Sequence, residues 1–88
     1  MRADSTNDAE TLALSALAAA LTDERRARRF LDLSGIETED LRRRAADPSL
    51  LAALLRFLEA HEPDLVAVAD AIGVAPTDLV AAREDLEG

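Results

Sequence analysis

Hydrophobic residues along this chain cluster in segments whose internal spacing is that of an amphipathic α-helix. In segment 48–61, for example, the leucines recur at intervals of one and three residues, which places them on one broad helix face. Six segments of this kind predict an all-α fold, a compact bundle of about six short helices. The predicted helices cover residues 8–21, 23–33, 38–46, 48–61, 63–72 and 76–86.

Proline and glycine mark the ends of several of these segments. Pro48, Pro63 and Pro76 stand at the beginning of three of them. Proline suits the first helical position because its missing N–H would have no partner there. Gly35 and Gly73 follow the ends of two others, where glycine accepts the left-handed conformation that closes a last turn. The prolines therefore predict helix starts, and the two glycines predict helix ends.

Residue type also predicts two N-caps and the place of three helices. Thr22 and Thr38 carry side-chain acceptors and are expected to cap the second and third helices. The first and fourth segments are apolar nearly all round, so we expect them at the centre of the bundle. The second has a narrower apolar face, formed by Ala27, Phe30 and Leu31.

The chain length permits one domain, expected over residues 8–88 after a disordered, polar and acidic tail at residues 1–7. A shift of 38 residues, the distance from Gly35 to Gly73, places segment 12–47 on segment 50–85. The shift predicts two related three-helix units; the alternative is convergent helix punctuation in a chain rich in leucine and alanine. The strongest matches are Gly35 with Gly73, Ile36 with Val74, Asp40 with Asp78 and Leu41 with Leu79.

Composition sharpens the helical prediction and limits the core. Hydrophobic residues make up 49% of the chain, and most of them are alanine or leucine, which are strong helix formers. Valine and isoleucine are scarce, which argues against strands. Each alanine buries little area, so this core gives the protein a reason to seek further burial against a partner or a second copy.

Charge is segregated along the chain. The net charge of −8 disfavours contact with phosphate backbones, yet residues 25–44 hold seven of the ten arginines. Acids interleave with them, and Glu39–Arg43 and Asp40–Arg44 have the spacing of favourable helical ion pairs. The cluster predicts either a salt-bridged, solvated surface or a docking surface for an acidic protein partner. The candidate partner surface consists of Arg25, Arg28, Arg29, Arg42, Arg43 and Arg44.

A second reading of the charge pattern concerns nucleic acid. Segment 65–82 has a small residue, a glycine four residues later and apolar anchors beyond it, which resembles a helix-turn-helix in geometry. Its second helix offers Asp78, Arg83 and Glu84, whereas phosphate contact needs lysine or arginine. We therefore expect this corner to be structural, and nucleic-acid binding is the alternative function.

Residues suited to catalysis or metal binding are sparse. His61 is the only histidine and is expected to cap the end of the fourth helix or to lie exposed. The chain has no cysteine and no glycine-rich phosphate loop. We expect no enzymatic activity, no cofactor, no metal and no small-molecule ligand. The polar N-terminus and the shortness of the longest apolar run predict a cytoplasmic protein that does not cross a membrane.

Three stretches carry a resemblance to a known family. The chain resembles a family of uncharacterised small bacterial proteins, defined only as a domain of unknown function, over about residues 9–86. The resemblance implies a stand-alone cytosolic helical protein and supplies no activity, partner or site residue. The stretches are Ala9–Leu14, the block FLDLSGIETEDLRRRAADPSLLAALLRFL and the terminal block DAIGVAPTDLVAARE.

These observations favour a non-enzymatic protein-interaction module, whose partner is an unknown protein or a second copy in a homodimer. The alternative is a nucleic-acid-binding regulator that uses the helix-turn-helix-like corner.

Overall fold

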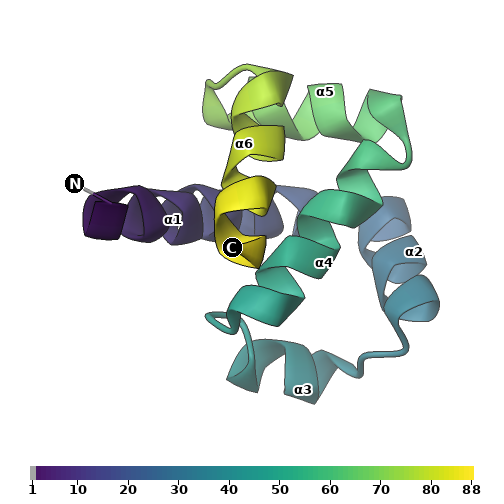
Figure 1. The fold of residues 1–88 in the computed structure, drawn as a ribbon. Helices are drawn as coiled ribbons and strands as arrows, with labels where there is room; N and C mark the ends of the chain where they lie inside the picture. The colour runs from purple at the N-terminus through teal and green to yellow at the C-terminus, as the bar shows by residue number, and fades with distance from the viewer. Residues whose placement is uncertain (1) are drawn as a thin grey trace.

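The computed structural model describes residues 2–88, and the side chains from residue 8 onward. No strand occurs in this range, and six helices follow one another along the chain (Figure 1). The predicted all-α class and the predicted order of helices are confirmed. The helices are α1 (Arg2–Leu21), α2 (Glu24–Ser34), α3 (Thr38–Arg43), α4 (Pro48–Glu59), α5 (Glu62–Ile72) and α6 (Pro76–Glu87).

Three helices cross at the centre of the bundle. α1 packs against α4 and α6, and α6 also packs against α4 (Figure 1). α5 lies along one edge and contacts α1, α4 and α6, while α2 packs on α1 and α4. α3 lies apart at the lower edge of Figure 1, between the end of α2 and the start of α4. The sequence placed α1 and α4 at the centre, and α6 joins them there.

The core is built from large side chains on α4 and small ones on α1. Five leucines of α4 are at most 1% exposed, which accounts for the broad apolar stripe of that helix. Facing them, the buried residues of α1 are mostly alanines at helical spacing. Small side chains let neighbouring helices approach closely, so most of the volume between α1 and its neighbours is filled from the other side. The alanines are Ala9, Ala13, Ala16 and Ala20.

Glycine ends two of the helices as predicted. Gly35 closes α2 with φ 72°, and its N–H donates to the carbonyl oxygen of Leu31 at 2.9 Å. Gly73 closes α5 with φ 76°. Residues with a Cβ rarely adopt this left-handed conformation, so glycine is the natural residue at both positions.

Both predicted threonine N-caps are wrong. Asp23 caps α2, because its side chain accepts a hydrogen bond from the N–H of Arg26, while the Thr22 hydroxyl donates back to the end of α1. α3 is preceded by Glu37, and Thr38 is its first helical residue. In each pair, neighbouring residues could both start a helix, and backbone geometry selects one of them.

Several boundaries also differ from the prediction by a few residues. α5 begins at Glu62, one residue before the proline, and α4 and α3 end earlier than the predicted residues 61 and 46. α1 extends back to Arg2. The predicted disordered tail at residues 1–7 lies outside the described side chains and stays a prediction. The 38-residue repeat also stays a prediction.

Enlarging an alanine of the α1 stripe should destabilise the fold. Ala16 is fully buried, so Ala16→Leu would overpack the centre of the bundle and should lower the free energy of unfolding by about 1–3 kcal/mol. Ala18→Leu, at an exposed position of the same helix, is the matched control and should change it by less than about 0.5 kcal/mol. Urea unfolding followed by circular dichroism measures both. Equal effects of the two substitutions would contradict the assigned core face of α1.

Candidate functional site

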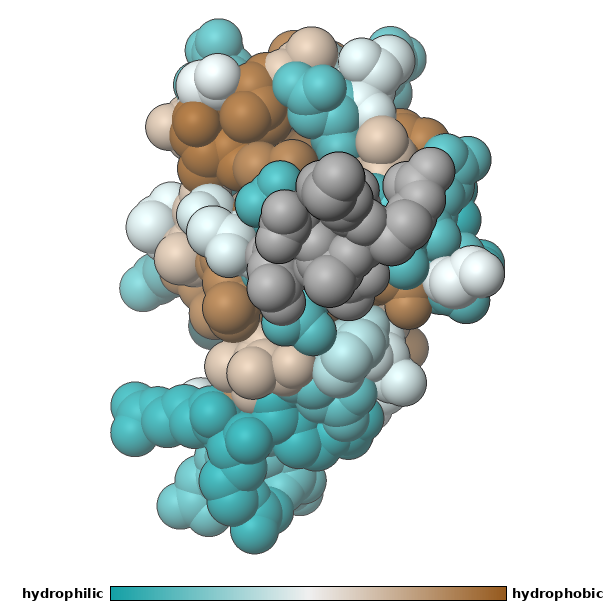
Figure 2. Space-filling model, turned by 60° about the vertical axis from the view of Figure 1, so that its left-hand side comes forward, coloured by the Kyte–Doolittle hydropathy of each residue, from teal (hydrophilic) through white to brown (hydrophobic). Residues whose placement is uncertain are grey.

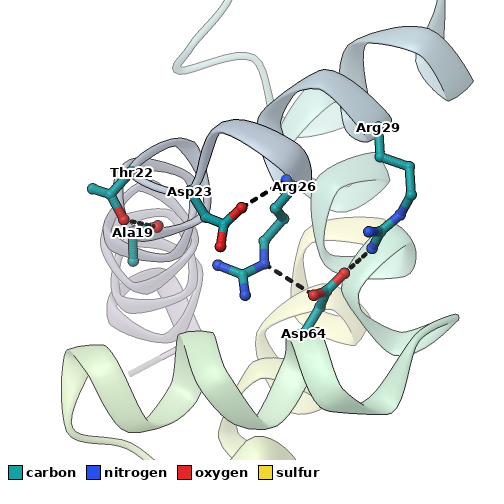
Figure 3. A network of polar contacts seen from close by, with 6 residues as sticks. All are labelled: Ala19, Thr22, Asp23, Arg26, Arg29 and Asp64. Atoms are coloured by element: carbon teal, nitrogen blue, oxygen red, sulfur yellow. Dashed lines mark hydrogen bonds and ion pairs between the residues drawn. The ribbon is translucent and has the colours of Figure 1, made fainter.

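The first turn of α5 carries a buried carboxylate. Asp64 is 7% exposed and is the one buried charged residue among residues 8–88. Arg26 donates to one carboxylate oxygen from its Nε at 3.0 Å, and the guanidinium of Arg29 donates to the other oxygen (Figure 3). Hydrogen bonds between ionised partners are among the stronger ones in proteins. The carboxylate therefore fastens α2 to α5.

Local structure places both arginines for this contact. The Asp23 cap fixes the start of α2, and residues 26 and 29 share a helix face because they are three positions apart (Figure 3). The Arg29 guanidinium also lies 5.1 Å from the ring centroid of Phe57, which meets the ring of Phe30 edge to face. This side of α2 is therefore occupied by contacts within the chain.

These contacts place one residue of the predicted partner surface in an ion pair within the chain. Arg29 belongs to that predicted set, but its guanidinium binds Asp64 and covers Phe57. Arg26, which the set leaves out, has the same partner, with only 15% of its side chain exposed. No local spacing in the sequence indicates this pair, because Arg26 and Asp64 lie 38 residues apart on different helices.

Two further arginines of the predicted set form local ion pairs. Arg43 pairs with Asp40, and Arg44 pairs with Asp47 at 3.4 Å, each across three residues. The expected pairs with a spacing of four residues, from Glu39 to Arg43 and from Asp40 to Arg44, are not the ones formed. All these groups are substantially exposed, and such pairs contribute little to stability.

The other three arginines of the predicted set have no such partner. Arg25, Arg28 and Arg42 are exposed, and no carboxylate of the described side chains lies within 4 Å of their guanidinium groups. Arg28 and Arg42 line two adjoining parts of a hollow between α1, α2 and α3. Arg25 is not among the residues that line this hollow.

That hollow is an apolar groove of about 390 Å³. Its polar lining residues are Thr38 and Arg42, both on α3. A shallower extension of about 290 Å³ continues over α2 past Arg28, and the two parts share lining residues. We call the two parts together the α1–α2–α3 groove. The apolar lining of its deeper part is Leu17, Leu21, Ala27, Leu31, Leu41 and Ala45.

The apolar face of α2 therefore does more than fill the core. The sequence predicted that Ala27 and Leu31 point inward with Phe30, but only Phe30 is buried, whereas the other two are half-buried in the groove. The groove itself was not predicted from the sequence. The sequence feature that corresponds to the groove is the apolar face of α2, which includes Ala27 and Leu31 besides the buried Phe30.

Charges near the shallow part of the groove are mixed. Glu24, Arg28 and Asp32 are each four residues apart on α2, so they follow one another along one helix face. Within the deeper part, Arg42 is the one charged lining residue. On the side of the molecule seen in Figure 2, the lower part, at the height of α3, is covered by hydrophilic side chains.

The helix-turn-helix-like corner is present in the backbone. α5 and α6 meet at 97° around Gly73. Arg83, the one basic residue of α6, donates to Glu59 at 2.6 Å and to Glu87 at 2.7 Å, and these carboxylates raise the pKa of its guanidinium. Arg56 also binds Glu87 and, with Arg83, lowers the pKa of that carboxyl. The basic side chain of this corner is therefore held by acids of its own chain.

His61 occupies a different place from the predicted one. It precedes α5 as the N-cap position instead of ending α4, and its side chain makes no capping hydrogen bond. The residue is exposed, which is the other expectation for it. Among the described residues, no group of three acids or histidines is arranged to hold a metal ion.

Within residues 2–88, no single helix is both long and apolar enough to cross a membrane. α5 and α6 together reach the length and composition of a span, but they are bent at 97°.

Comparison with known proteins identifies the family. Residues 6–88 match the model of a family described as "Protein of unknown function (DUF3572)". The chain belongs to this DUF3572 family. No curated protein and no solved structure matches the chain. The match covers almost the whole helical bundle, so the α1–α2–α3 groove and the buried Asp64 both lie inside the family domain.

Removal of the buried carboxylate should loosen α2. Asp64→Ala leaves Arg26 and Arg29 without their acceptor and should lower the free energy of unfolding by about 2 kcal/mol, since both arginines keep some access to water. Asp70→Ala, at an exposed position of the same helix, is the control. A double-mutant cycle of Asp64→Ala with Arg26→Ala should give a coupling energy of about 1 kcal/mol. A coupling indistinguishable from zero would contradict the ion pair.

The N-cap of α2 should make the free energy of unfolding depend on pH in the acidic range. The N–H of Arg26 bonds to the Asp23 carboxylate and lowers its pKa. Such a group contributes stability above its unfolded-state pKa of about 3.9, and the contribution disappears as the pH falls through the lower folded-state value. Asp23→Asn keeps an acceptor and cannot titrate, so its stability should fall less than that of wild type across this range. Urea unfolding at a series of pH values measures the difference, and parallel curves would refute the assignment.

Proposed function

We propose that this protein is a non-enzymatic protein-interaction module that binds a partner protein through the α1–α2–α3 groove. The observation that carries the proposal is the groove itself: six apolar residues line a hollow of about 390 Å³ on the surface of a chain whose core is largely alanine and leucine. Concave apolar surface with a few polar groups at its edge is typical of binding sites.

The energetic argument follows from what the groove leaves exposed. Leu21 and Leu31 are only half-buried, although each could bury its remaining apolar surface beneath a partner. Burial contributes about 25 cal/mol for each Å² of apolar surface removed from water. A helical partner laid along the groove would cover the side chains of three helices at once, which is a common mode of peptide recognition.

The charge distribution supports a protein partner over nucleic acid. Of the seven clustered arginines, four are in ion pairs with acids of the chain, which leaves three without a carboxylate within 4 Å among the described side chains. Phosphate recognition requires several free cations together. We also propose a cytoplasmic location, which the absence of cysteine from the sequence fits.

Photo-crosslinking in cells tests this function. A benzoyl-phenylalanine placed at Thr38, an exposed residue that lines the groove, should crosslink to a discrete protein that mass spectrometry identifies. Leu31→Glu, which puts a charge into the apolar lining, should abolish the adduct. The same probe at Ala71, exposed on α5 outside the groove, is the control. An adduct equally strong from both positions, or none from the groove, would overturn the proposal.

A further inference from the structure

The leucines of α1 and the arginines beside the α1–α2–α3 groove restrict what can bind there. Along α1, Leu17 and Leu21 line the groove, and Leu14, which is 37% exposed, lies on the same helix face one turn earlier. These three leucines span about 10 Å at 1.5 Å per residue. Leu17 is only 5% exposed, so Leu14 and Leu21 are the accessible members, and Leu14 lies beyond the lining of the groove. A row of this length matches two turns of another helix laid beside α1.

We infer that the occupant is an amphipathic helix of a partner protein that carries acidic residues beside its apolar anchors. This inference rests on the proposed function and names the chemistry of the partner. Apolar side chains of the partner enter between Leu17, Leu31 and Leu41, and its carboxylates reach Arg42 at the deeper part of the groove and Arg28 at the shallower part.

The acidic part of this inference follows from the two arginines. Arg42 is the one charged residue lining the deeper part of the groove, and no described carboxylate lies within 4 Å of it. Arg43 and Arg44, its neighbours on the chain, each have an acid of their own. The planar guanidinium binds a carboxylate with two parallel hydrogen bonds, which gives Arg42 a geometric as well as an electrostatic preference.

Mixed charge on α2 refines the partner further. Arg28 stands between Glu24 and Asp32 on one face, so a partner helix along α2 meets an alternation of charges. A uniformly acidic helix would place like charges against Glu24 and Asp32. The favoured partner therefore carries its acidic residues at two positions, opposite Arg28 and Arg42, with neutral polar residues between them.

Selection from a displayed library of helical peptides, randomised on all faces, tests this chemistry with the full-length protein as bait. Leu31→Glu serves as the counter-selection. We expect enriched peptides with leucine, isoleucine or phenylalanine at positions i, i+3 or i+4, and i+7, flanked by aspartate or glutamate. Apolar enrichment without acids would overturn this inference and leave the proposed function standing. No enrichment over the Leu31→Glu bait would overturn both.

Matched peptides then measure the charge contacts by fluorescence anisotropy. Replacement of the acids of the selected peptide by glutamine should weaken binding about tenfold or more, because hydrogen bonds to charged groups exceed neutral ones. Arg42→Glu in the protein should weaken binding of the acidic peptide and restore binding of a lysine version. Arg25→Glu, an exposed arginine on α2 outside the groove, is the control for net charge. Equal effects of the two arginine variants would overturn the inference.

Two other occupants are separate outcomes of the same experiments. Sedimentation equilibrium that shows a dimer dispersed by Leu31→Glu would assign the groove to a second copy of this chain. Micromolar binding of a fluorescent fatty acid that displaces the selected peptide, and that persists in Arg25→Glu but not in Arg42→Glu, would assign it to a small apolar carboxylate. Either result would overturn the helical partner.

Discussion

The ion pairs of one buried carboxylate hold α2 in place at the periphery of the bundle. Asp64 lies at the start of α5, and Arg26 and Arg29 reach it from α2. Few apolar contacts support α2, since Phe30 is its one buried residue. Burial of the Asp64 carboxylate without a partner would cost several kcal/mol. The carboxylate can therefore be buried only where the two guanidinium groups reach it. The orientation of α2 follows from this requirement.

The contacts of one face of α2 with α5 determine the direction in which its other face points. Arg26 and Arg29 face α5, and Ala27 and Leu31 therefore face away, toward α1 and α3. From α3, Thr38, Leu41 and Arg42 line the space in front of them. The groove therefore lies on another face of α2 than the ion pairs. One set of α2 residues binds Asp64, and a separate set lines the candidate binding site.

Helix punctuation could be predicted from the sequence because it acts locally. Gly35 and Gly73 end their helices through their own backbone conformation, and Pro48 begins α4 because its ring fixes the dihedral that the helix needs. The N-cap of α2 was harder to predict, because Thr22 and Asp23 both carry an acceptor and differ only in backbone position. Local chemistry therefore predicts the number and order of helices better than their first residues.

The ion-pair partners of the arginines could not be predicted in the same way. Sequence spacing alone does not decide between ion pairs three and four positions apart in a helix. Arg43 pairs with Asp40, at a spacing of three. The partner of Arg26 lies on another helix, so it depends on how the helices pack and on no local rule. The same holds for the groove, whose lining comes from three helices and becomes a surface only after they assemble.

Arg26 and Asp64 are separated by 38 residues, the interval of the predicted repeat. A dimer of two identical three-helix chains would place the same residue on both sides of its symmetry axis, so it could set arginine against arginine or aspartate against aspartate, with repulsion in either case. A single chain that contains both units has no such restriction. Under the repeat prediction, two units joined in one chain can carry arginine in one and aspartate in the other at the same position, as Arg26 and Asp64 do.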